Sequence, residues 1–176
     1  MIPFASAVSR RFTWSRLPHN RGYELKLNGS VVGTIRRRSL WTSDYDGTTS
    51  EKSFRIRRNS WCGTRAEIVD SISQEPIAAF ESGWRKPSVL TFTDGLRFQI
   101  TRKGCWRPQW GVTRENGQPV LSLDVRQKTG NPPVGTEVED SRLSLLILFI
   151  LYRIRQAEDD AAVSAVVAAI SVAAAS

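Results

Sequence analysis

The sequence predicts a mainly antiparallel β domain that encloses one apolar helix. Residues 23–125 consist of short β-type runs separated by turn residues, and no βαβ alternation interrupts them. A run of about ten large apolar residues follows near the C-terminus, short for a bilayer and apolar on every side. Many short strands with regular turns favour a barrel or a sandwich, and a barrel surrounds a helix on all its faces.

The length and composition fit one globular domain with flanking segments. The chain has 176 residues, of which 40% are hydrophobic and 24% charged, and this is enough to bury a sizeable core. We divide it into a basic N-terminal arm (1–21), a barrel domain (22–156) and an Ala-rich tail (157–176). The arm is expected to be flexible, and its lack of acidic residues keeps a targeting segment as an alternative.

Hairpins account for most of the expected strands. Residues 23–27 alternate apolar and polar, Asn28-Gly29 supplies a two-residue turn, and residues 31–35 return. Asn-Gly between two such runs is a strong hairpin signal, because a type I′ turn needs positive φ at both central residues. The same pattern recurs at 67–80, 90–100 and 111–125, a further strand is expected at 54–56, and 42–51 is expected to be a turn-rich loop.

The central helix is expected at 141–156. Asp140-Ser141 offers an N-cap, the apolar run follows, and Arg153 and Arg155 mark its end. Burying the large side chains of this run contributes about 15–20 kcal/mol before the opposing conformational entropy is counted. That is enough to organise a domain, so we interpret the run as a core helix, with a membrane span as the alternative.

The tail runs through Glu158-Asp159-Asp160 into an Ala/Val-rich stretch at 161–175. Alanine favours helix, and small side chains cover little apolar surface. We expect a second, marginal helix packed outside the barrel, with a frayed terminus or a weak tail anchor as alternatives. No integral membrane span is expected.

The positive charge directs attention to anionic partners. The net charge is +8, which favours phospholipid head groups, nucleic acid or acidic proteins. Arg36 and Arg38 follow the first hairpin, and Arg55 and Arg57 follow Phe54. Alternate residues of a strand share a face, so the members of each pair point the same way. If the two strands are neighbours, four guanidinium groups form an outer patch suited to phosphate oxygens. Alternatively, these arginines only blunt strand edges and keep the barrel soluble.

Other chemistries have less support in the sequence. The single histidine, His19, lies in the N-terminal arm, so no Ser/His or Cys/His pair is indicated and no enzyme is predicted. Cys62 and Cys105 lack the spacing of metal ligands, so we expect no metal, no cofactor and free thiols rather than a disulfide. A third basic group, Arg102-Lys103 with Arg107, lies in the turn before Trp110. Nucleic acid is a further option, because four tryptophans could stack on bases: Trp41, Trp61, Trp84 and Trp106.

Several short motifs occur in a fixed order along the chain. They are Tyr23-Glu24-Leu25, Gly33-Thr34-Ile35, Ile68-Val69-Asp70, Pro76-Ile77-Ala78, Trp84, Asp94-Gly95, Trp110 and Asn116-Gly117, followed by the apolar helix. This order resembles the tubby C-terminal-like superfamily, which includes the tubby domain, the phospholipid scramblases and the LURP-one-related proteins. The resemblance covers residues 22–156 and implies a closed barrel of about twelve strands around a central hydrophobic helix.

The resemblance implies no common enzymatic reaction. The best-understood members of this superfamily bind phosphoinositide head groups through basic side chains on the barrel wall, or lie at membranes. The chain lacks the cysteine-rich palmitoylation cluster of the scramblases, so lipid scrambling is not implied.

These observations give one leading hypothesis and two alternatives. The leading hypothesis is a non-enzymatic tubby-like barrel that binds phospholipid or phosphoinositide head groups through Arg36, Arg38, Arg55 and Arg57. Such a protein would be cytoplasmic and peripheral at the inner face of a membrane. The second hypothesis is a protein-interaction or structural scaffold whose charge only aids solubility, and the third is a nucleic-acid binder.

Overall fold

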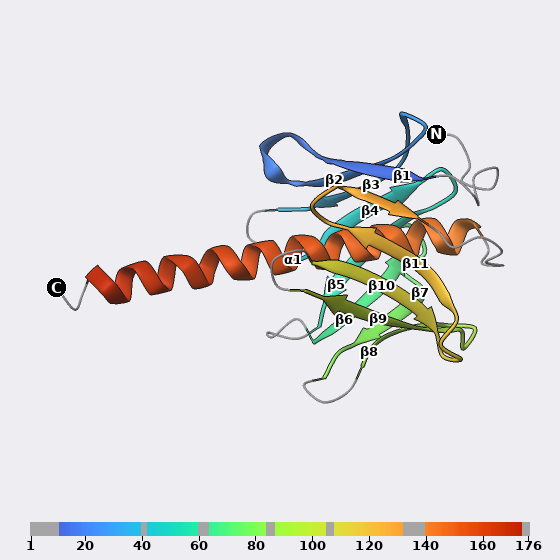
Figure 1. Cartoon of the computed structure of the whole chain (residues 1–176). Coiled ribbons are helices and arrows are strands. Elements are labelled where there is room, and N and C mark those ends of the chain that lie inside the picture. The colour runs from blue at the N-terminus through green and yellow to red at the C-terminus, as the bar shows by residue number, and fades with distance from the viewer. Residues whose placement is uncertain are drawn as a thin grey trace.

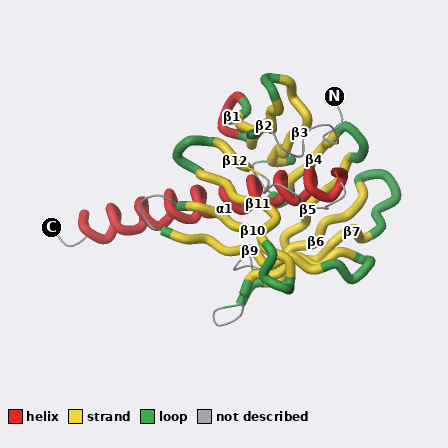
Figure 2. Tube along the Cα trace, turned by 45° about the vertical axis from the view of Figure 1, so that its right-hand side comes forward, coloured by secondary structure: helices red, strands yellow, loops and turns green. Residues whose placement is uncertain are grey.

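Twelve antiparallel strands close into a barrel around helix α1 (Figure 1, Figure 2). The computed structural model describes residues 11–39, 42–59, 64–83, 87–104, 108–131 and 140–173, and only the backbone at 20, 140–141 and 166–173. Each strand pairs with its neighbours in sequence, and β1 pairs with β12 to close the sheet. The predicted fold class is confirmed.

The elements follow one another as a simple meander. In chain order they are β1 (Phe12–Arg16), the 3-10 turn η2 (Pro18–Asn20), β2 (Gly22–Leu27), β3 (Ser30–Arg37), β4 (Tyr45–Thr49), β5 (Ser53–Arg58), β6 (Arg65–Asp70), β7 (Pro76–Glu81), β8 (Ser88–Phe92), β9 (Arg97–Lys103), β10 (Gln109–Arg114), β11 (Pro119–Asp124), β12 (Thr129–Asn131) and α1 (Asp140–Ala173).

The predicted hairpins are present with the expected turns. Asn28 and Gly29 have φ values of 50° and 83°, as a type I′ turn requires. The turn at Asp94-Gly95 joins β8 to β9, and the turn at Asn116-Gly117 joins β10 to β11.

The sequence-based boundary of the N-terminal arm is wrong, because the barrel begins at β1. Phe12 and Trp14 are buried in the core, and β1 pairs along its length with β2. The arm prediction for residues 1–10 lies outside the described residues.

The interpretation of 42–51 as a loop is also wrong, since β4 runs through it. Its inward positions are Tyr45, Gly47 and Thr49. A Cβ atom on Gly47 would lie 2.2 Å from the ring of Phe54 on β5. The Phe54 ring therefore lies across the glycine and supplies the apolar surface that β4 lacks.

The core consists of inward-facing strand residues packed around α1. Leu143, Leu145 to Tyr152 and Ile154 are buried, with Leu146 to Tyr152 fully so. Aromatic contacts join helix and wall: the ring centroids of Phe149 and Phe80 lie 5.1 Å apart, as do those of Tyr152 and Tyr45. The predicted core helix at 141–156 thus occupies the interior of the barrel and packs against the inner face of the sheet.

The tail differs from the expected second helix on the barrel wall. α1 continues without a break to Ala173 and leaves the barrel as a projecting rod. Side chains 161–165 are exposed. Within the described residues, no helix is both long and apolar enough to cross a bilayer.

The barrel therefore has two different ends. The short turns 28–29, 50–52, 71–75, 93–96 and 115–118 lie at one, which we call the turn end. The opposite end, where α1 emerges, carries the other strand connections, and we call it the exit end (Figure 1).

Candidate functional site

The sequence-predicted arginine patch is divided by an intervening strand. β4 lies between β3 and β5, so the condition that the two arginine-bearing strands be neighbours is not met. Arg36, Asp46 and Arg55 form one cross-strand row on the outer face. The Nε atom of Arg55 donates a hydrogen bond to Oδ1 of Asp46 at 2.9 Å. The carboxylate thus separates the two arginines and neutralises one of them.

The other two predicted residues lie nearer the exit end. Arg38 follows β3, and its backbone N–H donates to the carbonyl of Asp44 at 3.0 Å. The backbone of Arg57 pairs in register with Glu67, but its side chain reaches toward the turn end, where it contacts that of Gln74 in the 71–75 turn. The structure therefore brings Arg36 and Arg55 into one row but does not gather four guanidinium groups into one uninterrupted patch.

Several further sequence-based predictions fall outside the residues described. These are the cysteines, four of the tryptophans and the last member of the third basic group: Cys62, Cys105, Trp41, Trp61, Trp84, Trp106 and Arg107. Arg102 and Lys103 of that group are exposed at the exit-end terminus of β9.

Basic residues gather at the exit end. The residues counted at each end are those of the described strand connections together with the strand-terminal residues that border them. At the exit end the basic residues outnumber the acidic ones three to one. The basic residues are Arg16, Arg21, Arg37, Arg38, Arg58, Arg65, Lys103, Arg126 and Lys128, and the acidic residues are Asp44, Glu81 and Asp124.

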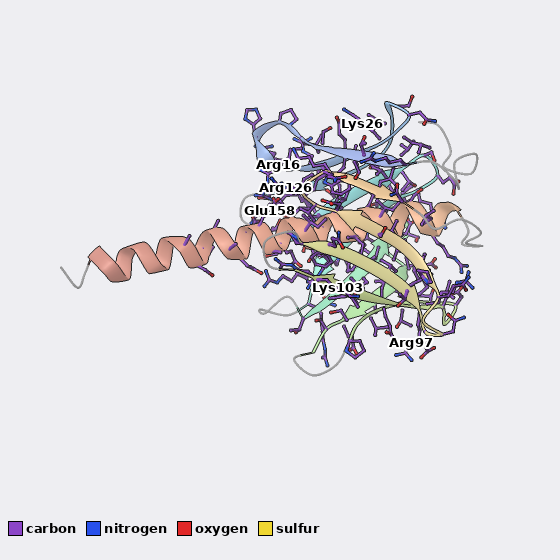
Figure 3. All side chains as sticks on the ribbon, in the orientation of Figure 1. Arg16, Lys26, Arg97, Lys103, Arg126 and Glu158 are labelled. Carbon is purple, nitrogen blue, oxygen red and sulfur yellow. The ribbon has the colours of Figure 1, made fainter. Side chains whose placement is uncertain are left out.

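The turn end has no such excess. Its basic residues are Lys52, Arg97 and Arg114, and its acidic residues are Glu51, Asp70, Glu75, Asp94 and Glu115. Figure 3 shows Arg16, Arg126 and Lys103 toward the end from which α1 emerges, and Lys26 and Arg97 toward the other. The barrel is therefore electrostatically polarised along its axis.

An ionic collar holds α1 where it leaves the barrel. Arg16 donates to Oε1 of Glu158 at 2.8 Å, and the Tyr23 hydroxyl donates to Oε2 at 2.9 Å. Arg155 contacts Glu158 at 3.2 Å and Asp159 at 2.6 Å. Burial, with help from the Glu158 carboxylate, raises the pKa of Tyr23 above its ordinary value. In this collar, two of the three helix carboxylates, those of Glu158 and Asp159, pair with Arg16 and Arg155.

A cavity of about 300 Å³ opens on another side of the emerging helix. Its lining includes Arg102 from β9 and Arg153, Gln156 and Asp160 from α1. The Arg153 guanidinium lies 4.6 Å from the centroid of the Phe80 ring and donates to Oε1 of Gln156 at 2.6 Å. Burial lowers the pKa of Arg153, yet a guanidinium keeps its charge at neutral pH. The cavity lining thus carries two positive charges, on Arg102 and Arg153, and one negative charge, on Asp160. This excess of positive charge favours the binding of an anion.

The described residues contain no group of three or more His, Cys, Asp or Glu side chains able to hold a metal ion. His19 is exposed in the turn η2.

The positions of the turn dipeptides in the sequence also indicate that the arginines gather at one end of the barrel. Asn28-Gly29, Asp94-Gly95 and Asn116-Gly117 mark alternate connections of an antiparallel meander. Alternate connections lie at one end of a barrel, so the arginine-bearing connections between them must share the other.

Comparisons with known proteins add no family to this geometry. No protein-family model matches the chain, and neither a curated protein nor a solved structure matches it. The resemblance to the tubby C-terminal-like superfamily stays a prediction.

Proposed function

We propose that this protein is a non-enzymatic barrel that binds an anionic phospholipid surface through its exit end. The observation that carries the proposal is the charge difference between the two ends of the barrel. Among the described strand connections and strand-terminal residues, basic residues outnumber acidic ones nine to three at the exit end, and acidic residues outnumber basic ones five to three at the turn end. Each Lys or Arg close to an anionic membrane contributes about 1 kcal/mol of attraction, so this asymmetry orients the barrel.

The exit end is a better candidate surface than the outer wall. On the wall, Asp46 lies between Arg36 and Arg55 and pairs with Arg55. At the exit end, Arg38 and Arg126 are exposed and their side chains have no partner among the described residues.

The cavity beside α1 offers a place for a single head-group phosphate. Arg102 and Arg153 line it, and a guanidinium group can form bidentate hydrogen bonds to phosphate oxygens. A phosphoinositide head group presents more phosphates than phosphatidylserine does and would engage both the cavity and the surrounding rim. We therefore propose that phosphoinositides are bound more tightly than phosphatidylserine.

Vesicle flotation tests the orientation with two matched variants. The first reverses charge at the exit end, Arg38→Glu with Arg126→Glu. The second makes the same change in net charge at the turn end, Lys52→Glu with Arg97→Glu. We expect the exit-end variant to bind phosphatidylserine-containing vesicles at least about tenfold more weakly at low salt, and the turn-end variant to bind like the wild type. Equal weakening of both would mean that net charge alone acts, and the proposal would be wrong.

The wall residues and the polyanion alternative each have their own test. If Arg36→Glu with Arg55→Glu weakens binding more than the exit-end variant, the site lies on the wall. Binding to double-stranded DNA with a steep salt dependence, together with no binding to vesicles, would replace the proposal with a nucleic-acid function.

A further inference from the structure

The projecting part of α1 is an apolar rod that starts at the exit end. After Asp160 the helix contains only Ala, Val, Ser and Ile up to Ala173. The described side chains at 161–165 are exposed, and Val163 is 63% exposed. Figure 1 shows none of the other described helices and strands beside this segment. A helix with no polar face is ordinarily covered on every side, because each face removes apolar area from water.

From this segment we infer that α1 residues 161–173 insert into one leaflet of the anionic bilayer that the exit end faces, an inference that rests on the proposed function. The direction fits, because the rod leaves the barrel at the exit end, where basic residues outnumber acidic ones on the strand connections. The length fits as well. At 1.5 Å per residue the segment spans about 20 Å, which equals one head-group layer of about 6 Å plus half of a hydrocarbon core of about 30 Å.

The polar groups of the segment agree with this depth. The Ser164 hydroxyl donates to the backbone carbonyl of Asp160 at 2.9 Å, so its hydrogen-bonding need is met within the helix. The carboxylates of Glu158 and Asp159 lie at the base of the rod and are paired in the ionic collar. The charge boundary at Asp160 therefore falls at the level of the head groups, with uncharged residues beyond it.

A second copy of the chain is a poorer occupant for this rod. Two helices each about 20 Å long and 10 Å wide bury less than the roughly 1,000 Å² expected of a stable protein interface. Packing against one partner helix also leaves the opposite side of each rod in water. Lipid covers all sides at once.

The test separates insertion from electrostatic attraction with two double variants of the full chain. Val163→Glu with Val167→Glu places charge on the rod, and Val163→Ala with Val167→Ala is the matched control. Each protein is bound to phosphatidylcholine vesicles containing phosphatidylserine at low salt. The vesicles are then washed in about 1 M NaCl, where charges are screened beyond about 3 Å.

We expect all three proteins to bind at low salt, and the wild type and alanine variant to stay bound through the wash. The glutamate variant should be retained at least about tenfold less. Equal retention of the glutamate variant and the wild type would overturn the inference and leave surface binding intact. Failure of the wild type to bind at low salt would instead overturn the proposed function, and the inference with it.

A lipid-free measurement addresses the second copy directly. Sedimentation of the wild type should give a monomer. A dimer that the glutamate variant dissolves would show that the rod is covered by another chain, and would overturn insertion. Matching thermal unfolding midpoints for the three proteins would confirm that the changes on this exposed segment leave the barrel folded.

Discussion

At the scale of single residues, three buried tyrosines near the exit end differ in how their hydroxyl groups are satisfied. Tyr23 donates to Glu158 in the collar. Tyr45 and Tyr152 pack edge to face, and burial raises the pKa of each. The Tyr152 hydroxyl has no hydrogen-bond partner among the described residues, and its pKa is raised to about 12. Burial therefore favours the neutral phenol of Tyr152, and its hydroxyl contributes no hydrogen bond to the stability of the fold.

We expect Tyr152→Phe to remove part of the alkaline sensitivity of the fold. Tyr152 ionises near pH 12 in the folded chain and near about pH 10 in the unfolded chain, so the folded state holds the proton more tightly. The stability that neutral Tyr152 contributes is complete below about pH 10 and is lost as the pH rises through about 12. Relative to the wild type, the phenylalanine variant should gain roughly 2–3 kcal/mol of unfolding free energy across that interval.

Urea unfolding at a series of pH values measures this difference. At neutral pH the variant should be as stable as the wild type or slightly more so, because a buried hydroxyl without a partner is removed. A difference between the two proteins that does not change with pH would contradict the assignment.

At the scale of elements, α1 is one continuous helix with two environments. Residues 145–152 are buried against the barrel wall, and residues 161–165 are exposed to solvent. The ionic collar around Glu158 marks the transition between them. Packing therefore stabilises the first half, while the second half depends on the intrinsic helix preference of alanine and on the continuity of the rod.

Alanine substitutions at matched positions on α1 should separate these halves. Phe149→Ala removes a fully buried ring that packs against Phe80 and Tyr152, and should lower the unfolding free energy by about 3–5 kcal/mol. Val163→Ala in the projecting part should change it by less than about 0.5 kcal/mol. Chemical denaturation of both variants is the measurement, and similar losses would mean that the projecting part is packed.

Two of the strands that sequence analysis missed, β4 and β12, share a physical cause. The inward position at the centre of β4 is Gly47, and that of β12 is Gly130. A Cβ on either glycine would lie within 2.2 Å of a phenylalanine ring from the paired strand, Phe54 or Phe12. The apolar side chain that completes each inward row is therefore encoded in a neighbouring strand, where a search for alternation along one segment does not find it.

The predictability of the candidate site follows the same division. Alternation correctly placed Arg36 on the outer face of β3 and Arg55 on the outer face of β5. It does not reveal that Asp46 lies between them, because Gly47 at the inward centre of β4 leaves this segment without the alternation of a strand. In β1, Phe12, Thr13 and Trp14 alternate between apolar and polar, but the arginines on both sides favour a basic arm over a strand.

At the scale of the whole molecule, the helix and the strand number require each other. The interior of a barrel of about eight strands is already filled by its own side chains, and the diameter grows with each further strand. Twelve strands leave a wider lumen, which here is occupied by the large residues of α1. Without the helix, the inner rows of the sheet would face an unfilled space.

Two truncated chains test this mutual dependence. A chain that ends after residue 160 keeps the whole core and collar, and should unfold cooperatively with a midpoint within about 2 °C of the wild type. A chain that ends after residue 139 lacks the filling and should show no cooperative transition. Thermal scans by circular dichroism distinguish them, and a cooperative transition in the shorter chain would contradict this account of the core.

The order of elements also has a consequence for biosynthesis. A ribosome releases all twelve strands before the residues of α1, so the inner face of the nascent sheet has nothing to pack against during most of translation. The closing pair, β1 with β12, also becomes possible only when the last strand has emerged. Exposed apolar strands in this interval are prone to aggregate and to recruit chaperones. The protein is thus expected to complete its fold late, with the insertion of α1 as the step that ends its dependence on cellular folding assistance.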